Sequence, residues 1–281
     1  MGDEKVLSGI RAVLLDLDGV MYRGVQLCHG AAEFVRFARA RNIRTFFLSN
    51  NSRSGPEVVA RKLTGLDVAT PEEEVITAAE LAVEHLAGLR RKGSVAVIGS
   101  DWLAEQLQAA GWSLAGAEAD CVLVGLDHQF SYAKLRLGVD ALLGGARFVA
   151  ANRDPVNPIE ETLEPGCGAL VAALETATGR RASCIGKPSL RILHKALARL
   201  QLRPAQTLMV GDSLVSDMAL ARRGGTHSAL LLSGQTNAEM ARRLPAARRP
   251  DLVLEDLAEL QALWQRDTTS DIWTSSVGTR P

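Results

Sequence analysis

Carboxylates at the ends of apolar runs are the residues of this chain with the clearest capacity for chemistry. Asp16 and Asp18 follow the branched apolar run at residues 13–15. Asp212 ends a second such run, and Asp217 lies one helical turn further on. Clustered carboxylates without histidine or cysteine favour a hard cation with oxygen ligands, which in this setting means Mg²⁺.

A hydroxyl group, two amides and an ammonium group accompany these acids. Ser49 ends an apolar run that begins at residue 45, and Asn50 and Asn51 follow it directly. Lys187 lies in a tight Gly-Lys-Pro loop. Mg²⁺, an ammonium, a hydroxyl and the backbone N–H groups after Asp16 would together neutralise the oxygens of a phosphoryl group.

The two acids of the first run have different tasks in such chemistry. One carboxylate directed at phosphorus can attack it and form an aspartyl phosphate, which water later cleaves. The other must protonate the leaving alkoxide and then deprotonate that water, which requires a pKa raised by partial burial. Each residue also has a plain structural interpretation: Ser49 as a helix cap, Lys187 as a loop charge and Asp217 as a surface residue. Their joint occurrence at strand ends favours a site.

The elements that must position these residues alternate between strand and helix. We expect strands at 13–15, 45–49, 207–212, 227–232 and 252–254, and helices at 30–41, 56–62, 168–178, 189–200, 215–223 and 256–265. This alternation predicts an α/β fold with a doubly wound parallel sheet. The carboxyl ends of parallel strands meet at one edge, so the polar groups converge on a single crevice.

A middle block has its own alternation of elements. We expect helices at 78–89, 101–110 and 131–143, and strands at 95–99, 121–125 and 147–151. Asp101 and Ser131 are candidate N-caps for two of these helices. The block is either a continuation of the first sheet or a separate inserted domain, and periodicity does not decide between them.

Composition excludes several classes of partner. The chain has 281 residues, enough for two domains, and its 32 Lys and Arg balance 32 Asp and Glu, so no global charge favours nucleic acid or anionic membrane. No apolar run reaches the length of a membrane span, and no signal-peptide pattern is present. The four scattered cysteines suit a reducing cytosol. We therefore expect a soluble cytoplasmic protein, and we interpret the arginine pairs at 242–243 and 248–249 as a solvated turn.

Several segments together resemble a known superfamily. Residues 16–20 (DLDGV), 47–52 (FLSNNS), 185–189 (IGKPS) and 210–212 (VGD) with Asp217 resemble the four motifs of the haloacid dehalogenase (HAD) superfamily. More narrowly, residues 50–53, 130–135, 151–155 and 165–173 resemble its NagD-like branch of nitrophenylphosphatases and pyridoxal phosphate or phosphoglycolate phosphatases. The match covers nearly everything up to about Trp264.

The resemblance implies a role for each motif residue. Asp16 would be the nucleophile, Asp18 the general acid and base, and Lys187 a bridge between the phosphoryl group and Asp16. The phosphoryl oxygens would be held by Ser49, Asn50 and Asn51. Mg²⁺ would be bound by Asp16, the backbone carbonyl of Asp18 and Asp212, with Asp217 nearby as a ligand or an anchor.

The resemblance also assigns the middle block to a large α/β cap inserted between the second and third motifs. It implies a catalytic core at 1–78 and 180–266, a cap at 79–179 and a loose C-terminal tail at 267–281. Proteins of this branch often dimerise through the cap. The cap loop that begins at Asn152 would face the leaving group, where Arg153 and Asp154 are candidate substrate contacts. Pairing of Arg153 with Asp154 is an equally plain interpretation.

The leading function is therefore a Mg²⁺-dependent phosphomonoester hydrolase of small phosphorylated metabolites. Candidate substrates are pyridoxal phosphate, phosphoglycolate, nucleoside monophosphates and aryl phosphates. A phosphotransferase would use the same site and differ only in whether water enters. A non-catalytic phospho-acceptor module is the alternative from another class, and Asp18 argues against it, because a stored acyl phosphate is better served without a resident general base.

Overall fold

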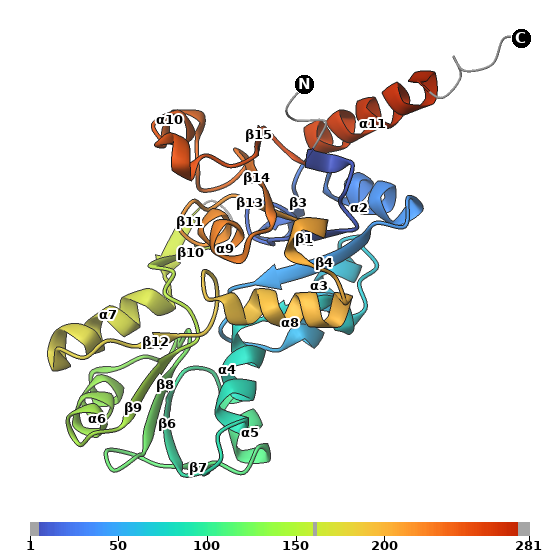
Figure 1. Cartoon of the computed structure of the whole chain (residues 1–281). Helices are drawn as coiled ribbons and strands as arrows, with labels where there is room; N and C mark the ends of the chain where they lie inside the picture. The colour runs from blue at the N-terminus through green and yellow to red at the C-terminus, as the bar shows by residue number, and fades with distance from the viewer. Residues whose placement is uncertain (1–5, 160–161, 275–281) are drawn as a thin grey trace, which may run out of the picture. The chain divides into compact units, whose positions relative to one another are not determined.

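The structure, a computed structural model, describes residues 6–159 and 162–274. The chain divides into two compact units (Figure 1). Of the described residues, unit 1 comprises 6–47, 66–68 and 196–274, and unit 2 comprises 48–65, 69–159 and 162–195. The division follows compactness rather than sequence motifs, so the expected domain boundaries at 79 and 179 stay a prediction.

Parallel strands form the centre of unit 1. They lie in the order β15 (Leu252–Leu254), β14 (His227–Leu231), β13 (Thr207–Gly211), β1 (Ala12–Leu15) and β4 (Arg44–Ser49). Each neighbouring pair is parallel. Every residue of β1 and β13 is buried, as expected where helices cover both faces of a parallel sheet. The predicted α/β fold with its parallel sheet is confirmed.

The helices of unit 1 are α2 (Ala31–Ala40), α9 (Asp217–Gly224), α10 (Ala238–Arg242) and α11 (Leu257–Thr274). Phe34 and Phe37 of α2 meet Trp264 of α11 with ring centroids 6.3 to 6.4 Å apart. Each such aromatic pair contributes about 0.5–1.5 kcal/mol beyond its buried area. The helix α11 runs past the predicted end at 265, and residues 275–281 of the predicted tail lie outside the described residues.

Unit 2 has a second parallel sheet. Its strands are β12 (Ser183–Cys184), β9 (Arg147–Ala150), β8 (Cys121–Val124), β6 (Ser94–Ile98) and β7 (Ser113–Leu114), in that order. Its helices are α3 (Pro56–Gly65), α4 (Ala78–Ala87), α5 (Asp101–Ala109), α6 (Tyr132–Leu143) and α7 (Cys167–Thr178). The middle block therefore builds a sheet of its own and is not a continuation of the first sheet.

The expected N-caps are right for one helix and wrong for another. Ser131 caps α6, and its side chain accepts a hydrogen bond from Lys134 N at 3.3 Å. The cap of α5 is Ser100, whose Oγ accepts from Leu103 N at 3.4 Å, and not Asp101. Asp101 is the first helical residue instead, where its negative charge suits the positive end of the helix dipole.

Two hairpins escaped the sequence analysis. One is β2 (Tyr22–Arg23) with β3 (Gln26–Leu27), and the other is β10 (Val156–Ile159) with β11 (Thr162–Pro165). Their strands are too short for an alternating pattern to be visible, and two prolines lie in the second hairpin. The remaining elements are η1 (Glu72–Glu74), β5 (Val75–Thr77), α8 (Leu190–Leu200), η2 (Pro204–Gln206) and η3 (Ala246–Arg248).

Within residues 6–159 and 162–274, no helix combines the length and the apolar composition that crossing a bilayer requires.

Candidate active site

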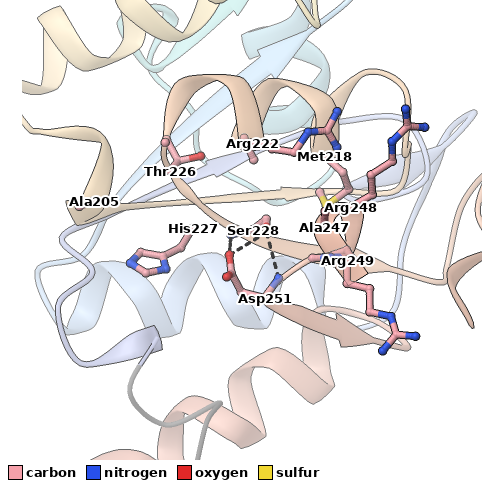
Figure 2. A pocket seen from close by; sticks show the side chains of 13 residues that line it. Ala205, Met218, Arg222, Thr226, His227, Ser228, Ala247, Arg248, Arg249 and Asp251 are labelled. Atoms are coloured by element: carbon pink, nitrogen blue, oxygen red, sulfur yellow. Dashed lines mark hydrogen bonds between the residues drawn. The ribbon is translucent and has the colours of Figure 1, made fainter. Parts of the chain in front are cut away.

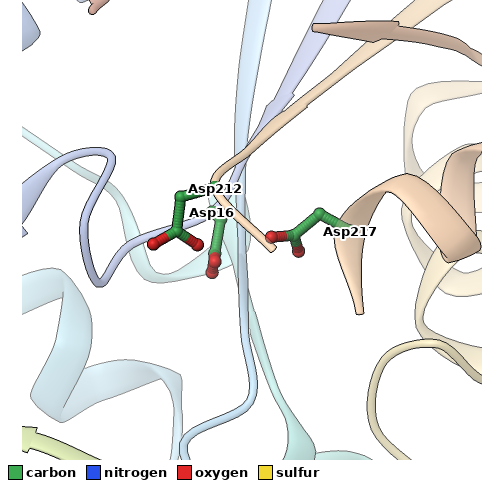
Figure 3. Close-up of side chains that lie close together, drawn as sticks. All are labelled: Asp16, Asp212 and Asp217. Atoms are coloured by element: carbon green, nitrogen blue, oxygen red, sulfur yellow. The ribbon is translucent and has the colours of Figure 1, made fainter. Parts of the chain in front are cut away.

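Three carboxylates of unit 1 lie close together and form what we call the carboxylate cluster: Asp16, Asp212 and Asp217. Each offers one oxygen, and these oxygens all lie within 4.8 Å of one another. Figure 3 shows the three side chains directed at a common point. Asp16 is 9% exposed, Asp212 1% and Asp217 0%, so the charges are held away from bulk water.

Adjacent strands bring the cluster together. Asp16 follows β1 and Asp212 follows β13, and the last residue of β1, Leu15, pairs with Val210 of β13. Asp16 N continues the ladder by donating to Val210 O at 2.9 Å. Asp217 begins α9, the helix that follows β13. The expectation that these acids share one sheet edge is therefore correct for these three side chains.

Backbone donors orient two of the carboxylates. Asp212 Oδ2 accepts from Gln235 N at 2.7 Å, and Asp217 Oδ2 accepts from Ser213 N at 3.2 Å. A Cβ on Gly234 would lie 1.8 Å from Asp212 Oδ2, so only glycine lets this loop approach. Sequence reasoning missed the loop at 233–236, although it follows β14 at the same sheet edge and the strand-end rule already applied would have found it.

The cluster fits a hard divalent cation. Its donors are all carboxylate oxygens, the ligands that Mg²⁺ prefers. Three negative charges this close together repel one another in a buried setting, and a divalent cation offsets that repulsion. Three of the oxygen donors predicted for Mg²⁺, the carboxylates of Asp16, Asp212 and Asp217, thus lie together in the folded chain.

Asp18 does not contribute its carboxylate to this cluster, within the part of the chain that the structure describes. The chain turns after Leu17, where Gly19 has a φ of 82° and its N donates to Tyr22 O at 2.9 Å. Asp18 is half-buried in this turn. Burial raises the pKa of Tyr22 well above its ordinary value, and the charges of Asp18 and Asp16 raise it further. Tyr22 therefore stays a protonated phenol beside both acids.

Unit 2 contains a second polar group, which we call the Asn50 network: Asn50, Asp154 and Lys187. Asn50 Nδ2 donates to Asp154 Oδ2 at 2.9 Å and to Asp154 Oδ1 at 3.2 Å. Its Oδ1 accepts from Lys187 N at 2.8 Å. One amide side chain thereby joins the loop that carries Asp154 to the loop that carries Lys187.

The surroundings of this network are equally constrained. Ser49 is 2% exposed, and its Oγ accepts from Asn51 N at 3.0 Å, which shapes the turn after β4. Lys187 is 2% exposed. A Cβ on Gly186 would lie 2.6 Å from Asn50 Oδ1, so the loop before Lys187 needs glycine there. A hydrogen bond thus holds Ser49 and Asn51 in one turn after β4, and Asn50 between them joins this turn to the loop that carries Lys187.

Arg153 pairs with a partner that the sequence analysis did not identify. Its Nη2 lies 2.5 Å from Glu175 Oε1 on α7, so the expected pairing with Asp154 is wrong. Glu175 is 9% exposed and also meets Arg181 at 2.8 Å. Burial alone raises the pKa of Glu175, but hydrogen bonds from Ala182 N, Arg153 and Arg181 outweigh that effect and lower it.

Comparison with known proteins decides the family. A family model described as haloacid dehalogenase-like hydrolase matches residues 13–113, and one described as HAD-hydrolase-like matches residues 184–260. The chain belongs to the haloacid dehalogenase-like hydrolases. Within this family, chronophin from Rattus norvegicus is 37% identical over 272 residues, which cover 91% of this chain and 88% of chronophin.

Solved structures of HAD hydrolases agree. The 4-nitrophenylphosphatase of Thermotoga maritima superimposes with a TM-score of 0.85 at 30% identity, covering 92% of this chain and 99% of that one. Glycerol phosphate phosphatase of Mycobacterium tuberculosis, solved with magnesium, gives a TM-score of 0.81 at 33% identity, covering 91% of this chain and 77% of that one. The predicted nitrophenylphosphatase-like branch is confirmed, and this HAD hydrolase is a phosphatase of small phosphorylated substrates.

Proposed function

We propose that the chain is a Mg²⁺-dependent phosphomonoester hydrolase that works through an aspartyl phosphate on Asp16. The carboxylate cluster carries the proposal, because three buried acids within 4.8 Å match the oxygen ligand set of Mg²⁺. A relative of the same fold was solved with magnesium. When bound by Asp16, Asp212 and the backbone carbonyl of Asp18, with Asp217 as a ligand or an anchor, Mg²⁺ supplies positive charge against the phosphoryl oxygens.

In the first step the carboxylate of Asp16 attacks phosphorus and the ester oxygen leaves. Asp18 donates a proton to that oxygen, so the product departs as an alcohol. In the second step Asp18 takes a proton from water, which cleaves the acyl phosphate and releases inorganic phosphate.

The residues of unit 2 hold the group that is transferred. In the proposal, Ser49, Asn50 and Asn51 donate to the phosphoryl oxygens, and the Lys187 ammonium neutralises them and Asp16. Asp154 is a positioning residue, because its hydrogen bonds reach Asn50 rather than a catalytic atom. Arg153 is the proposed contact for a second anionic group of the substrate, and Glu175 sets how far its charge is already neutralised.

The test follows phosphate with an aryl phosphate as substrate. We expect inorganic phosphate release that depends on Mg²⁺ and stops with a chelator, and an acid-quenched sample that contains protein-bound phosphate sensitive to hydroxylamine. Transfer to an added alcohol in preference to water would instead identify a phosphotransferase. A phosphorylated chain without turnover would identify a phospho-acceptor module, and release independent of any divalent ion would remove the metal from the proposal.

The substrate is open to a direct screen. Pyridoxal phosphate, phosphoglycolate, nucleoside monophosphates and aryl phosphates are the candidates, and the names of the relatives add glycerol phosphate. The ratio kcat/KM across this set identifies the preferred leaving group. Dimerisation through the cap remains a proposal, which sedimentation of the full chain tests.

A further inference from the structure

Unit 1 contains a cavity that lies away from the carboxylate cluster. Its volume is about 340 Å³, and it is lined by residues at the starts of β14 and β15, on α9 and around η3. Figure 2 shows the side chains that surround it. Thr226 precedes β14 and Asp251 precedes β15, so the cavity lies at the amino edge of the parallel sheet.

This edge is the opposite of the one that holds the acids. Asp212 follows the last residue of β13, whereas the cavity residue Ala205 precedes its first residue, Thr207. Five strand residues at roughly 3.3 Å each separate the two edges by roughly 16 Å. A molecule in the cavity therefore does not occupy the position of the substrate.

The cavity has an apolar floor and a cationic rim. Met218, Ala221 and Ala247 make up the apolar part of the lining, which we call the floor. Arg222, Arg248 and Arg249 supply the rim, and Figure 2 shows the guanidinium groups of Arg222 and Arg248 on one side of the drawn residues, with that of Arg249 on the other. Such a surface suits an anion with a small apolar body.

The rim arginines have capacity to bind. Among residues 6–159 and 162–274, the guanidinium groups of Arg222 and Arg248 have no ion pair and no hydrogen bond, whereas Arg249 Nε donates to Leu244 O at 3.3 Å. The carboxylate in the cavity lining, that of Asp251, is bound within the lining itself, because its Oδ2 accepts from Ser228 N and Ser228 Oγ at 2.8 Å each. The rim is thus positively charged on balance.

A buried threonine lies in the wall of the cavity. Thr226 lines the cavity, is 8% exposed, and its Oγ1 has no hydrogen-bond partner within the described part of the chain. A buried hydroxyl without a partner costs free energy, so native proteins rarely keep one without water or a ligand nearby. The two unpaired guanidinium groups offer the charge-assisted donors that a phosphate dianion requires, whereas Thr226 Oγ1 is shielded from solvent and would have to rotate to join them.

We propose that this cavity, bounded by Arg222, Thr226 and Arg248, is a second binding site for a small phosphorylated molecule, distinct from the catalytic centre. The volume lies at the lower end of the range for small-molecule pockets, which fits a phosphate on a compact organic group. The proposal does not depend on the aspartyl phosphate or on the metal, because no residue of the catalytic set lines the cavity.

Nuclear magnetic resonance of the full chain with ¹³C-labelled methionine methyl groups tests the site. Met218 lies in the cavity floor and is 3% exposed, and Met21 lies in the turn that follows Asp18 and reports the catalytic end separately. The probe is phenylphosphonate, whose C–P bond a phosphomonoesterase does not cleave. We expect a saturable shift of the Met218 signal, and tighter binding than that of inorganic phosphate, because the ring covers the apolar floor.

Two double variants distinguish specific binding by the cavity arginines from general electrostatic attraction. Arg222→Gln with Arg248→Gln should weaken the Met218 response by at least about tenfold, the loss expected for one charge-assisted hydrogen bond. Arg242→Gln with Arg243→Gln removes the same charge next to the cavity and should change it less than about twofold. Unchanged signals from the other methionines show that each variant is folded.

Three results would overturn the proposal. The first is a Met218 signal that phenylphosphonate does not move. The second is an equal loss of binding in both double variants, which would mean general electrostatic attraction. The third is tighter binding of benzoate than of phenylphosphonate, which would exclude phosphate as the recognised group.

Discussion

The carboxylate cluster of unit 1 and the Asn50 network of unit 2 are both polar, but they differ in how their charges and hydrogen-bonding groups are paired. The cluster gathers three like charges within 4.8 Å. The network pairs an amide with a carboxylate at 2.9 Å and with a backbone N–H at 2.8 Å. The first arrangement is incomplete without a cation, and the second is complete as it stands.

This difference suggests different tasks for the two groups: the cluster would bind a ligand, and the network would keep side chains aligned. A group of like charges gains free energy only from a ligand of opposite charge, so it can bind and activate. The hydrogen bonds of the Asn50 network keep its members in one arrangement, including Asn50 and Lys187, to which we assign the phosphoryl oxygens. Changes in or beside the cluster should therefore abolish turnover or metal binding, whereas changes in the network should slow turnover in proportion to lost alignment.

The largest effect is expected from Asp16→Asn. The amide cannot attack phosphorus, so turnover of an aryl phosphate should fall by about four orders of magnitude or more, as for loss of other enzymic nucleophiles. Circular dichroism should show an intact fold, because the backbone hydrogen bond from residue 16 N to Val210 O does not involve the side chain. Normal turnover by this variant would remove Asp16 from its role.

Asp18→Asn should have the next largest effect. An amide cannot shuttle the proton, and general acid–base catalysis typically contributes about 10²- to 10⁴-fold. The loss should be smaller for 4-nitrophenyl phosphate than for an alkyl phosphate, because the aryl leaving group needs less help from an acid. Equal rates for variant and wild type on both substrates would mean that another group moves the proton.

Asp154→Ala tests the network. Asn50 Nδ2 would lose its two acceptors on Asp154 and keep only Lys187 O, at 3.3 Å, which should lower kcat by about ten- to a hundredfold through misalignment of Asn50 and Lys187. Asp154→Asn keeps one acceptor and should recover most of the rate, which a merely structural role does not predict. Asp120→Asn, a change at an exposed carboxylate bonded to Ser94 in the same unit, is the matched control. Full activity of Asp154→Ala would refute the positioning role.

Asp217→Asn tests metal binding by the carboxylate cluster through thermal stability, not through the rate of turnover. At Mg²⁺ a hundredfold above its Kd, the wild type should gain about 2.7 kcal/mol by linkage. The variant should lose most of this gain, and with a chelator it should be the more stable of the two, because one of three neighbouring charges is removed. Thermal denaturation with and without Mg²⁺ measures both, and an identical Mg²⁺ response in the two proteins would exclude Asp217 from the metal site.

The smallest effect is expected from Glu175→Gln. The folded chain lowers the pKa of Glu175 below its ordinary value of 4.5, so its ionisation stabilises the fold above that pH, and the stabilisation disappears as pH falls through the lower folded pKa. The variant should be about 1 kcal/mol less stable at pH 7. Denaturant titrations should show this deficit shrinking in acid, and a deficit independent of pH would contradict the assignment.

Local sequence patterns predicted the strands of the first sheet and the meeting of the acids at their ends. Buried parallel strands appear as unbroken apolar runs, which is why β1, β4 and β13 were predicted close to their observed bounds. Because neighbouring parallel strands end at one edge, the meeting of Asp16 with Asp212 was also predictable. The ends of helices were harder to predict. Ser100 caps α5 although Asp101 was expected to, because both residue types suit the N-cap position.

What the sequence by itself determined is the identity and order of the chemical groups, because these depend on periodicity and strand ends within a few residues of each other. The tertiary structure alone decided their partners. Asn50 meets Asp154 across 104 residues, Arg153 meets Glu175 on another element, and Arg222 shares a cavity with Arg248. Such contacts depend on how elements that are far apart in the sequence pack together, and no local pattern of residues specifies that packing.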